Sequence, residues 1–288
     1  MSQNRKIKRR LRVDRIAGAV VIVVILFYFL ANVGSCSKGG SDPAVPTDNN
    51  VSETTQQVSE TSEEDTQLIV CIDAGHGGND PGSLAQYTTR YEKNDNLAIA
   101  LSVQKYLQQR QNDVNLKIIM TRSDDTFVSL DDRCTIANLA KADLFVSLHR
   151  NSASGANGVE VWVHNEEPQP DCRLAYNILV NLDKAGISKN KGVRFGYISD
   201  PNENYQVNRE TDMPSCLVEL GFMDSVEDNT LFDDNLDKYG EAIADAIIQT
   251  AKELGLKGLE SDVVQPIETD YYNYDVSDYI PDPSVGEH

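Results

Sequence analysis

Two histidines and two glutamates stand in or beside segments where the packing of an apolar core does not explain a polar side chain. His76 lies in the turn VCIDAGHGGNDPG, between glycines and directly after an apolar run. His149 ends the run DLFVSLH, Glu219 stands inside the apolar CLVELGF, and Glu92 lies in RYEKNDN. Two neutral imidazoles and one carboxylate form a ligand set that binds Zn²⁺ in hydrolases, leaving a fourth position for water. A further carboxylate is needed to accept the proton of that water. These residue types therefore indicate a metal-dependent hydrolase.

Each of the four residues also has a purely structural interpretation. His76 could bond to nearby backbone in its turn, although glycines on both sides suggest a close approach of the backbone to a bound group. Glu92 could be a solvated acid near a helix N-terminus. His149 could be a core histidine. Glu219 is the hardest to explain in this way, because a buried and unpaired carboxylate costs several kcal/mol.

The elements that must position these residues are short apolar runs alternating with helical segments. Six runs are strand candidates: LIVCI (68–72), LKIIMT (116–121), DLFVSLH (143–149), GVEVWVH (158–164), VRFGYI (193–198) and SCLVELGF (215–222). Strands that are apolar on both faces and alternate with helices predict an α/β fold with a single, mostly parallel sheet covered by helices on both faces. Ligands of such sheets gather beyond the carboxyl ends of the strands.

Helix boundaries are indicated by capping residues and by apolar periodicity. Asn94 or Asn96 is expected to cap the helix that follows Glu92. Ser129 begins SLDDRCTIANLAKA, a capping-box start. A further helix is expected over 170–185. Apolar side chains from Tyr239 to Leu254 repeat with a 3.6-residue period, which predicts a last helix closed by Gly255.

The N-terminus carries the pattern of a membrane anchor. Residues 1–15 contain seven basic side chains and one acidic one, a net charge of +6. The segment 16–36 is uncharged and long enough to span about 30 Å of hydrocarbon as a helix. The positive-inside rule then predicts a single-pass protein of the cell membrane, with 1–15 cytoplasmic and the rest of the chain outside. Two alternatives are a cleaved signal peptide, which gives a secreted protein, and a lipoprotein modified at Cys36.

The remaining chain divides into a linker, one domain and a tail. Residues 37–66 are polar and acidic, so a disordered linker is expected there. One catalytic domain is predicted over 67–258, followed by an acidic disordered tail over 259–288. The formal charge of the whole chain is −19. Because nucleic-acid phosphates require a basic face, this charge argues against a nucleic-acid partner.

Six ordered blocks of the sequence resemble one enzyme family. They are DAGHGGNDPG, YEKNDNLAIAL, TRSDDTFVSLDDRCTIAN, ADLFVSLHRN, GVEVW and RETDMPSCLVELGFMDS. In this order and spacing they look like the zinc-dependent N-acetylmuramoyl-L-alanine amidases of the amidase-3 type, over residues 68–254. The resemblance implies that His76, Glu92 and His149 bind one Zn²⁺ and that Glu219 is the catalytic carboxylate. It also implies a peptidoglycan substrate, cut at the amide between the lactyl group of N-acetylmuramic acid and L-alanine.

The residue after the second histidine departs from this pattern. The family commonly has a small or apolar residue there, whereas this chain has Arg150. One hypothesis places Arg150 on the wall of the groove, where it binds substrate by pairing with a stem-peptide carboxylate. The alternative is a surface arginine paired to a neighbouring acid.

Two other functions remain open from the residues themselves. One is a non-catalytic peptidoglycan-binding module, against which the intact Glu219 argues. The other is a zinc peptidase that cuts within the stem peptide, which differs only in the amide placed over the metal.

Overall fold

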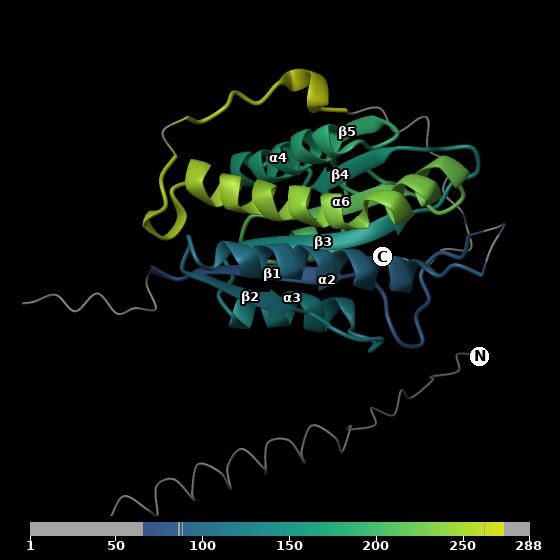
Figure 1. Ribbon diagram of the computed structural model, residues 1–288, viewed down its shortest axis with the longest axis horizontal. Coiled ribbons are helices and arrows are strands. Elements are labelled where there is room, and N and C mark those ends of the chain that lie inside the picture. Colours follow the sequence, from purple (N-terminus) through teal and green to yellow (C-terminus); the bar gives the residue numbers. More distant parts are fainter. Residues whose placement is uncertain (1–65, 86, 88, 262, 274–288) are drawn as a thin grey trace, which may run out of the picture. The chain divides into compact units, whose positions relative to one another are not determined.

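The computed structural model describes residues 66–85, 87, 89–261 and 263–273 (Figure 1). The predicted basic segment, membrane anchor and almost all of the linker lie outside these residues, as does the end of the predicted tail. Among the helices of the described part, none combines the length and the apolar character that crossing a bilayer requires.

The core of the fold is a mixed six-stranded sheet in the order β2-β1-β3-β6-β4-β5. Its strands are β1 (Leu68–Ala74), β2 (Leu116–Met120), β3 (Leu144–Asn151), β4 (Val159–Val163), β5 (Asn190–Phe195) and β6 (Ser215–Phe222). Every neighbouring pair is parallel except β4 and β6, which are antiparallel. All six predicted strands are thus present in a mostly parallel sheet. Only β5 is displaced, because it begins and ends three residues earlier than the predicted run 193–198.

Helices cover both faces of this sheet. The first face packs against α2 (Glu92–Arg110), α4 (Gln169–Ala185) and α6 (Val226–Glu253), and Figure 1 shows α6 lying along α2 and α4. The second face packs against α3 (Leu130–Leu139) and the short α5 (Gln206–Glu210). Because successive strand residues alternate between the two faces, both sets of side chains are buried, which confirms the predicted α/β class.

The helix starts agree only in part with the predicted caps. Ser129 caps α3 as expected, because its hydroxyl accepts a hydrogen bond from the Asp132 N–H at 3.2 Å. The start of α2 was predicted too late, since this helix begins at Glu92. There the carbonyl of Ser83 accepts the Glu92 N–H at 3.0 Å, so the helix is capped by the backbone of the preceding loop rather than by a side chain. Gly255, at a φ of +63°, follows the end of α6 as predicted.

Part of the predicted disordered tail is ordered against the sheet. The chain continues through the 3₁₀ turns Leu256–Gly258 and Thr269–Tyr271. Tyr272 then pairs with Val193 of edge strand β5, and the Asn273 N–H donates to the Val193 carbonyl at 2.9 Å. The ring of Tyr272 packs edge-on against Phe195. The prediction is therefore wrong for residues 269–273, because the unpaired backbone groups of an edge strand offered them a partner.

A buried acid at the start of α4 makes stability depend on pH. Asp171 is 7 % exposed, and burial raises its pKa to about 6, although the backbone N–H of Ser215 partly offsets this. A raised carboxyl pKa contributes stability that is fully present below the ordinary value of 3.8 and is lost as pH rises through 6. Asp171→Asn should therefore raise the free energy of unfolding at pH 8 by about 2 kcal/mol, and much less at pH 4.

Urea denaturation at the two pH values measures this difference. Glu227→Gln is the matched control, because Glu227 is an exposed acid in the first turn of α6. An equal gain at pH 4 and pH 8 for the Asp171 variant would contradict the assigned titration.

Candidate metal centre

His76 is presented by a tight turn at the end of β1. It adopts a φ of +59°, which is uncommon for a residue with a side chain, and the backbones of Gly77 and Asp80 close the turn with two hydrogen bonds of 3.0 Å. The Nδ1 of His76 lies 2.7 Å from Oδ2 of Asp80, while Oδ1 of Asp80 accepts the Gly82 N–H at 3.1 Å. One carboxylate thus fixes both the turn and the orientation of the imidazole.

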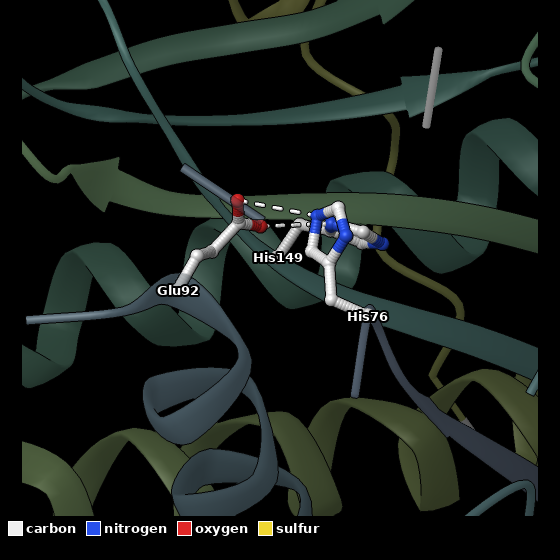
Figure 2. A group of neighbouring side chains, drawn as sticks. All are labelled: His76, Glu92 and His149. Atoms are coloured by element: carbon white, nitrogen blue, oxygen red, sulfur yellow. Dashed lines mark hydrogen bonds and ion pairs between the residues drawn. The ribbon is translucent and has the colours of Figure 1, made fainter. Parts of the chain in front are cut away.

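Glu92 is the first residue of α2 and is fully buried. Its Oε2 accepts the Ser83 N–H at 2.9 Å and lies 3.2 Å from Nε2 of His76. Its Oε1 accepts the side-chain amide of Asn96 at 3.0 Å and lies 2.9 Å from Nδ1 of His149. Each carboxylate oxygen therefore contacts one of the two imidazoles, as Figure 2 shows.

His149 stands near the end of β3, where the neighbouring turn leaves space for its ring. A Cβ placed on Gly75 would lie 2.2 Å from the His149 ring, so a side chain there would displace it. A Cβ on Gly82 would lie 2.6 Å from the ring of His76 and 2.7 Å from the carboxylate of Glu92. Gly75, directly before His76, thus allows the backbone to approach the cluster closely, as the sequence suggested, and Gly82 later in the same loop does so too.

The three side chains fit a metal ion. One nitrogen of His76, one nitrogen of His149 and one oxygen of Glu92 lie within 4.8 Å of one another, and all three residues are buried. Because Nδ1 of His76 is engaged by Asp80, its Nε2 is the atom that faces the other two donors. Carboxylates that orient metal-binding histidines in this way are a regular feature of zinc sites. The structure therefore brings together the three residues that were predicted as ligands.

The electrostatics of the cluster favour a cation. Burial alone would lower the pKa of His76, but the Glu92 and Asp80 carboxylates outweigh it and raise the pKa to about 10. Burial would raise the pKa of Glu92, and the two imidazoles instead hold it well below its usual range. Burial lowers the pKa of His149, which keeps that ring neutral. A buried anion between two imidazoles is an environment that stabilises a positive ion.

Glu219 lies beside this cluster on the next strand. Its Cα is in register with that of His149 across the β3–β6 pair. The side chain is 1 % exposed, and its Oε2 has no hydrogen-bond partner among the described residues. Burial, followed by the charges of Glu92 and Glu160, raises its pKa well above the usual range. Such a buried carboxyl group, perturbed and incompletely bonded, is typical of a catalytic acid or base.

Glu160 faces Glu219 from the other side but is fully engaged. The two residues are in register across β4 and β6. One oxygen of Glu160 lies 2.7 Å from Nε of the buried Arg194, and the other accepts from Asn151 at 2.9 Å and from Trp162 at 3.1 Å. Of these two neighbouring carboxyl groups, Glu219 is therefore the one available for chemistry.

Arg150 does not reach the groove, so its predicted contact with substrate is wrong. It is 0 % exposed, and its guanidinium donates to Asp95 at 2.7 Å and to Asn229 at 2.8 Å. The same group lies 4.5 Å from the centroid of the Phe232 ring. The alternative prediction was a surface arginine paired to an acid. Its pairing is confirmed by the contact with Asp95, but its surface location is wrong. The backbone N–H of Arg150 donates to Glu92 at 3.1 Å, so the residue helps to position the Glu92 carboxylate.

Two supporting residues were not predicted from the sequence. Asp80 stands four positions after His76 within the same turn, a spacing that could have marked it as the partner of the imidazole. Arg133 of α3 pairs with the buried Asp73 at 2.6 Å and donates to the carbonyl of His76 at 2.8 Å. It belongs to a helix 57 residues away, and no local pattern indicates this contact.

The cluster opens to a cavity of about 220 Å³ on the surface of the domain. Both histidines line it, so a ligand in this space can contact the candidate metal site. The other lining residues are Asp80, Phe127, Val128, Leu130 and Arg133.

Comparison with known proteins places this site in a family. Residues 70–249 match the Amidase_3 family, described as N-acetylmuramoyl-L-alanine amidase. A probable cell wall amidase, LytH, of Staphylococcus epidermidis is 33% identical over 187 residues, which cover 64% of this chain and 57% of the relative. LytH of Staphylococcus aureus is 34% identical over 186 residues, covering 62% and 56%. The chain therefore spans little more than half the length of these curated relatives.

Solved structures are similar over the same part of the chain. An N-acetylmuramoyl-L-alanine amidase from Clostridium difficile 630 superposes with a TM-score of 0.59 at 29% identity, covering 65% of this chain and 98% of that one. The catalytic domain of CwlV, from Bacillus (Paenibacillus) polymyxa var. colistinus, gives a TM-score of 0.56 at 36% identity, covering 66% and 99%. The described domain thus corresponds to nearly the whole length of both structures.

Proposed function

The chain belongs to the Amidase_3 family of N-acetylmuramoyl-L-alanine amidases, and from this premise we propose that it hydrolyses peptidoglycan at the amide between the lactyl group of N-acetylmuramic acid and L-alanine. The observation that carries the proposal is the buried cluster of His76, Glu92 and His149 with Glu219 in register beside it. It joins a metal-binding donor set to a carboxyl group that packing does not explain.

One zinc ion is the proposed cofactor, and His76, Glu92 and His149 would hold it. Two imidazoles and one carboxylate form a donor set of catalytic zinc sites. Zinc in such a set supplies Lewis acidity towards a carbonyl oxygen and towards water. Asp80 accepts a hydrogen bond from Nδ1 of His76 and so directs Nε2 towards the other two donors, where it would bind the metal.

Glu219 is the proposed catalytic residue. Its carboxylate accepts a proton from the attacking water and delivers it to the nitrogen of the leaving L-alanine. Water is consumed, the amide C–N bond breaks, and the products are a lactyl carboxylic acid and a peptide with a free amino terminus. The Cα of Glu219 is in register with that of His149 across the parallel strands β3 and β6, so both side chains lie on the same sheet face, which supports this role.

Two alternative functions are weaker on physical grounds. A pure peptidoglycan-binding module has no use for a buried carboxyl group whose Oε2 lacks a partner among the described residues. A zinc peptidase would use the same four residues on an amide within the stem, and the family favours the first amide instead.

Digestion of purified sacculi by the full-length protein, with zinc supplied, tests the proposal. The expected products are new L-alanine amino termini without new reducing sugar ends. New amino termini from inside the stem would instead support the peptidase. Binding without cleavage, by both the native protein and Glu219→Gln, would support the binding module.

For the cellular location, we propose a single-pass anchor over residues 16–36 with the domain outside the cytoplasmic membrane. The charge asymmetry of the first 36 residues supports it. Fractionation of cells should recover the chain with membranes, and protease added to spheroplasts should digest the domain. Release of the chain into the medium would favour a cleaved signal. Loss of membrane association in Cys36→Ala would favour the lipoprotein.

Replacing Asp80 by asparagine should weaken zinc binding by about 10- to 100-fold. The asparagine carbonyl can still accept the Gly82 N–H, but it does not supply the negative charge that orients and polarises His76. Competition with a chelator measures the zinc affinity. Asp234→Asn is the control, since it removes an exposed acid from α6. Equal zinc affinity in both variants would show that Asp80 serves the turn alone.

A further inference from the structure

A second cavity of about 210 Å³ adjoins the one over the candidate metal site. Leu130, the first residue of α3, lines both cavities. The second cavity is also lined by Tyr197, Glu203, Asn204, Tyr205, Gln206 and Arg209. A ligand whose reacting bond lies over His76 and His149 can therefore extend past Leu130 into this space.

The second cavity is preformed by packing and by a cross-link between two elements. Tyr205 is 3 % exposed and packs edge-on against Trp162 at 5.5 Å and against Tyr197 at 4.8 Å between ring centroids. The side-chain amide of Gln206 donates to Asp131 of α3 at 2.6 Å. The aromatic floor and this link hold the cavity open beside α3, so a ligand need not organise it.

The wall of the cavity carries charges of both signs. Arg209 is 43 % exposed, with its Nε bonded to Glu210 at 2.8 Å and one terminal nitrogen 3.3 Å from the Asn204 carbonyl. These contacts orient the guanidinium. Glu203 is exposed and adds a negative charge to the same lining. A guanidinium and a carboxylate on one small cavity suit a ligand that itself carries a carboxylate and an ammonium group.

We propose that the second cavity binds the peptide stem of the substrate and that Arg209 pairs with the carboxylate of the stem residue after L-alanine. This inference rests on the proposed amidase function and names a specificity-determining residue for it. The stem leaves the scissile amide at its L-alanine end, passes Leu130 and places its charged side groups against Arg209 and Glu203. The glycan strand then lies on the other side of the metal site.

The chemistry of the cavity fits a peptide better than a sugar. The N-acetylated sugar rings are neutral, and they bind proteins largely by stacking on an exposed aromatic face. The floor here offers little such face, because Tyr205 is buried between two other rings. The two charges of the wall would have no partners on neutral sugar rings, whereas the stem supplies both.

Two synthetic muramoyl tripeptides that differ only in their second stem residue test the assignment. One carries D-glutamate with a free α-carboxylate, and the other carries D-isoglutamine, in which that group is an amide. For the full-length native protein with zinc, kcat/KM should be about tenfold higher for the free carboxylate. Arg209→Gln should remove this preference. The exposed Lys238→Gln on α6 changes the same charge elsewhere and should keep it.

Binding of the uncleaved tripeptides to the Glu219→Gln protein gives a second readout. The dissociation constant of the carboxylate form should rise about tenfold when Arg209→Gln is added, and much less for the amide form. Equal preference in the native protein and Arg209→Gln would overturn the inference, as would discrimination by glycan length alone. Cleavage of neither tripeptide nor sacculi by the native protein would instead refute the proposed function.

Discussion

Glu219→Gln should lower amidase turnover by about 10²- to 10⁴-fold while zinc remains bound. Glutamine has nearly the shape of glutamate but cannot accept the proton of the attacking water. Because Glu219 is not one of the three gathered donors, the ligand cluster stays intact. The measurement pairs the rate of L-alanine amino-terminus release with the zinc content of the same protein.

Thermal stability provides the control for this variant. Burial already disfavours the charged form of Glu219, so the neutral glutamine should leave the melting temperature at neutral pH unchanged or higher. Stability retained and activity lost together identify a functional carboxyl group. Substantial turnover by Glu219→Gln would require another proton acceptor. Glu160 is a poor candidate, because its two oxygens are already bonded to Arg194, Asn151 and Trp162.

The strands and the two candidate metal-binding histidines could be predicted because their signals are local, whereas the ligand role of Glu92 was implied by the resemblance to the family. The strands are short apolar runs, and β1, β3 and β6 are buried along their whole length. Their length and the helical segments between them mark such runs as strands, because periodicity alone does not distinguish a buried strand from a buried helix. His76 and His149 follow or end these runs, and parallel strands bring such ends to one edge of a sheet. Glu219 was notable because an acid within a buried strand needs a reason.

The pairing of the strands and the capping of α2 by a preceding loop could not be predicted from local signals. The reversal of β4 against β6 depends on which strands become neighbours, and an apolar run of five residues carries no direction. The start of α2 was misplaced because its capping carbonyls belong to the loop before it rather than to an asparagine side chain. The first half of α6 is polar and acidic, so periodicity identified only its apolar second half.

Arg150 shows the same limit at a single residue. An arginine directly after a candidate ligand histidine is expected in the groove, because charged side chains are seldom fully buried. Its burial is explained by Asp95, which lies 55 positions earlier in the chain, and by Asn229, 79 positions later. Only the packing of α2 and α6 against the sheet brings these partners together, so no local pattern could indicate them.

Replacing this buried arginine by methionine should therefore lower the free energy of unfolding by about 3–5 kcal/mol. Arg150→Met removes one of the two ion-pair partners of the buried Asp95 and leaves only Arg90 paired with it. It also removes the contact of the guanidinium with the Phe232 ring. Urea denaturation measures the loss. Because the side chain is fully buried, KM for wall fragments should stay at the native value in the folded protein.

Arg110→Met is the matched control, since Arg110 also joins α2 to an aspartate, Asp245 of α6, but at the surface. Screening by water limits such an exposed pair to less than about 1 kcal/mol. Similar losses in the two variants would mean that burial of Arg150 adds nothing to the strength of its pair. A raised KM with unchanged stability would return Arg150 to the substrate groove. The expected pattern is a loss of stability with an unchanged KM, and it assigns Arg150 a structural role behind the Glu92 carboxylate.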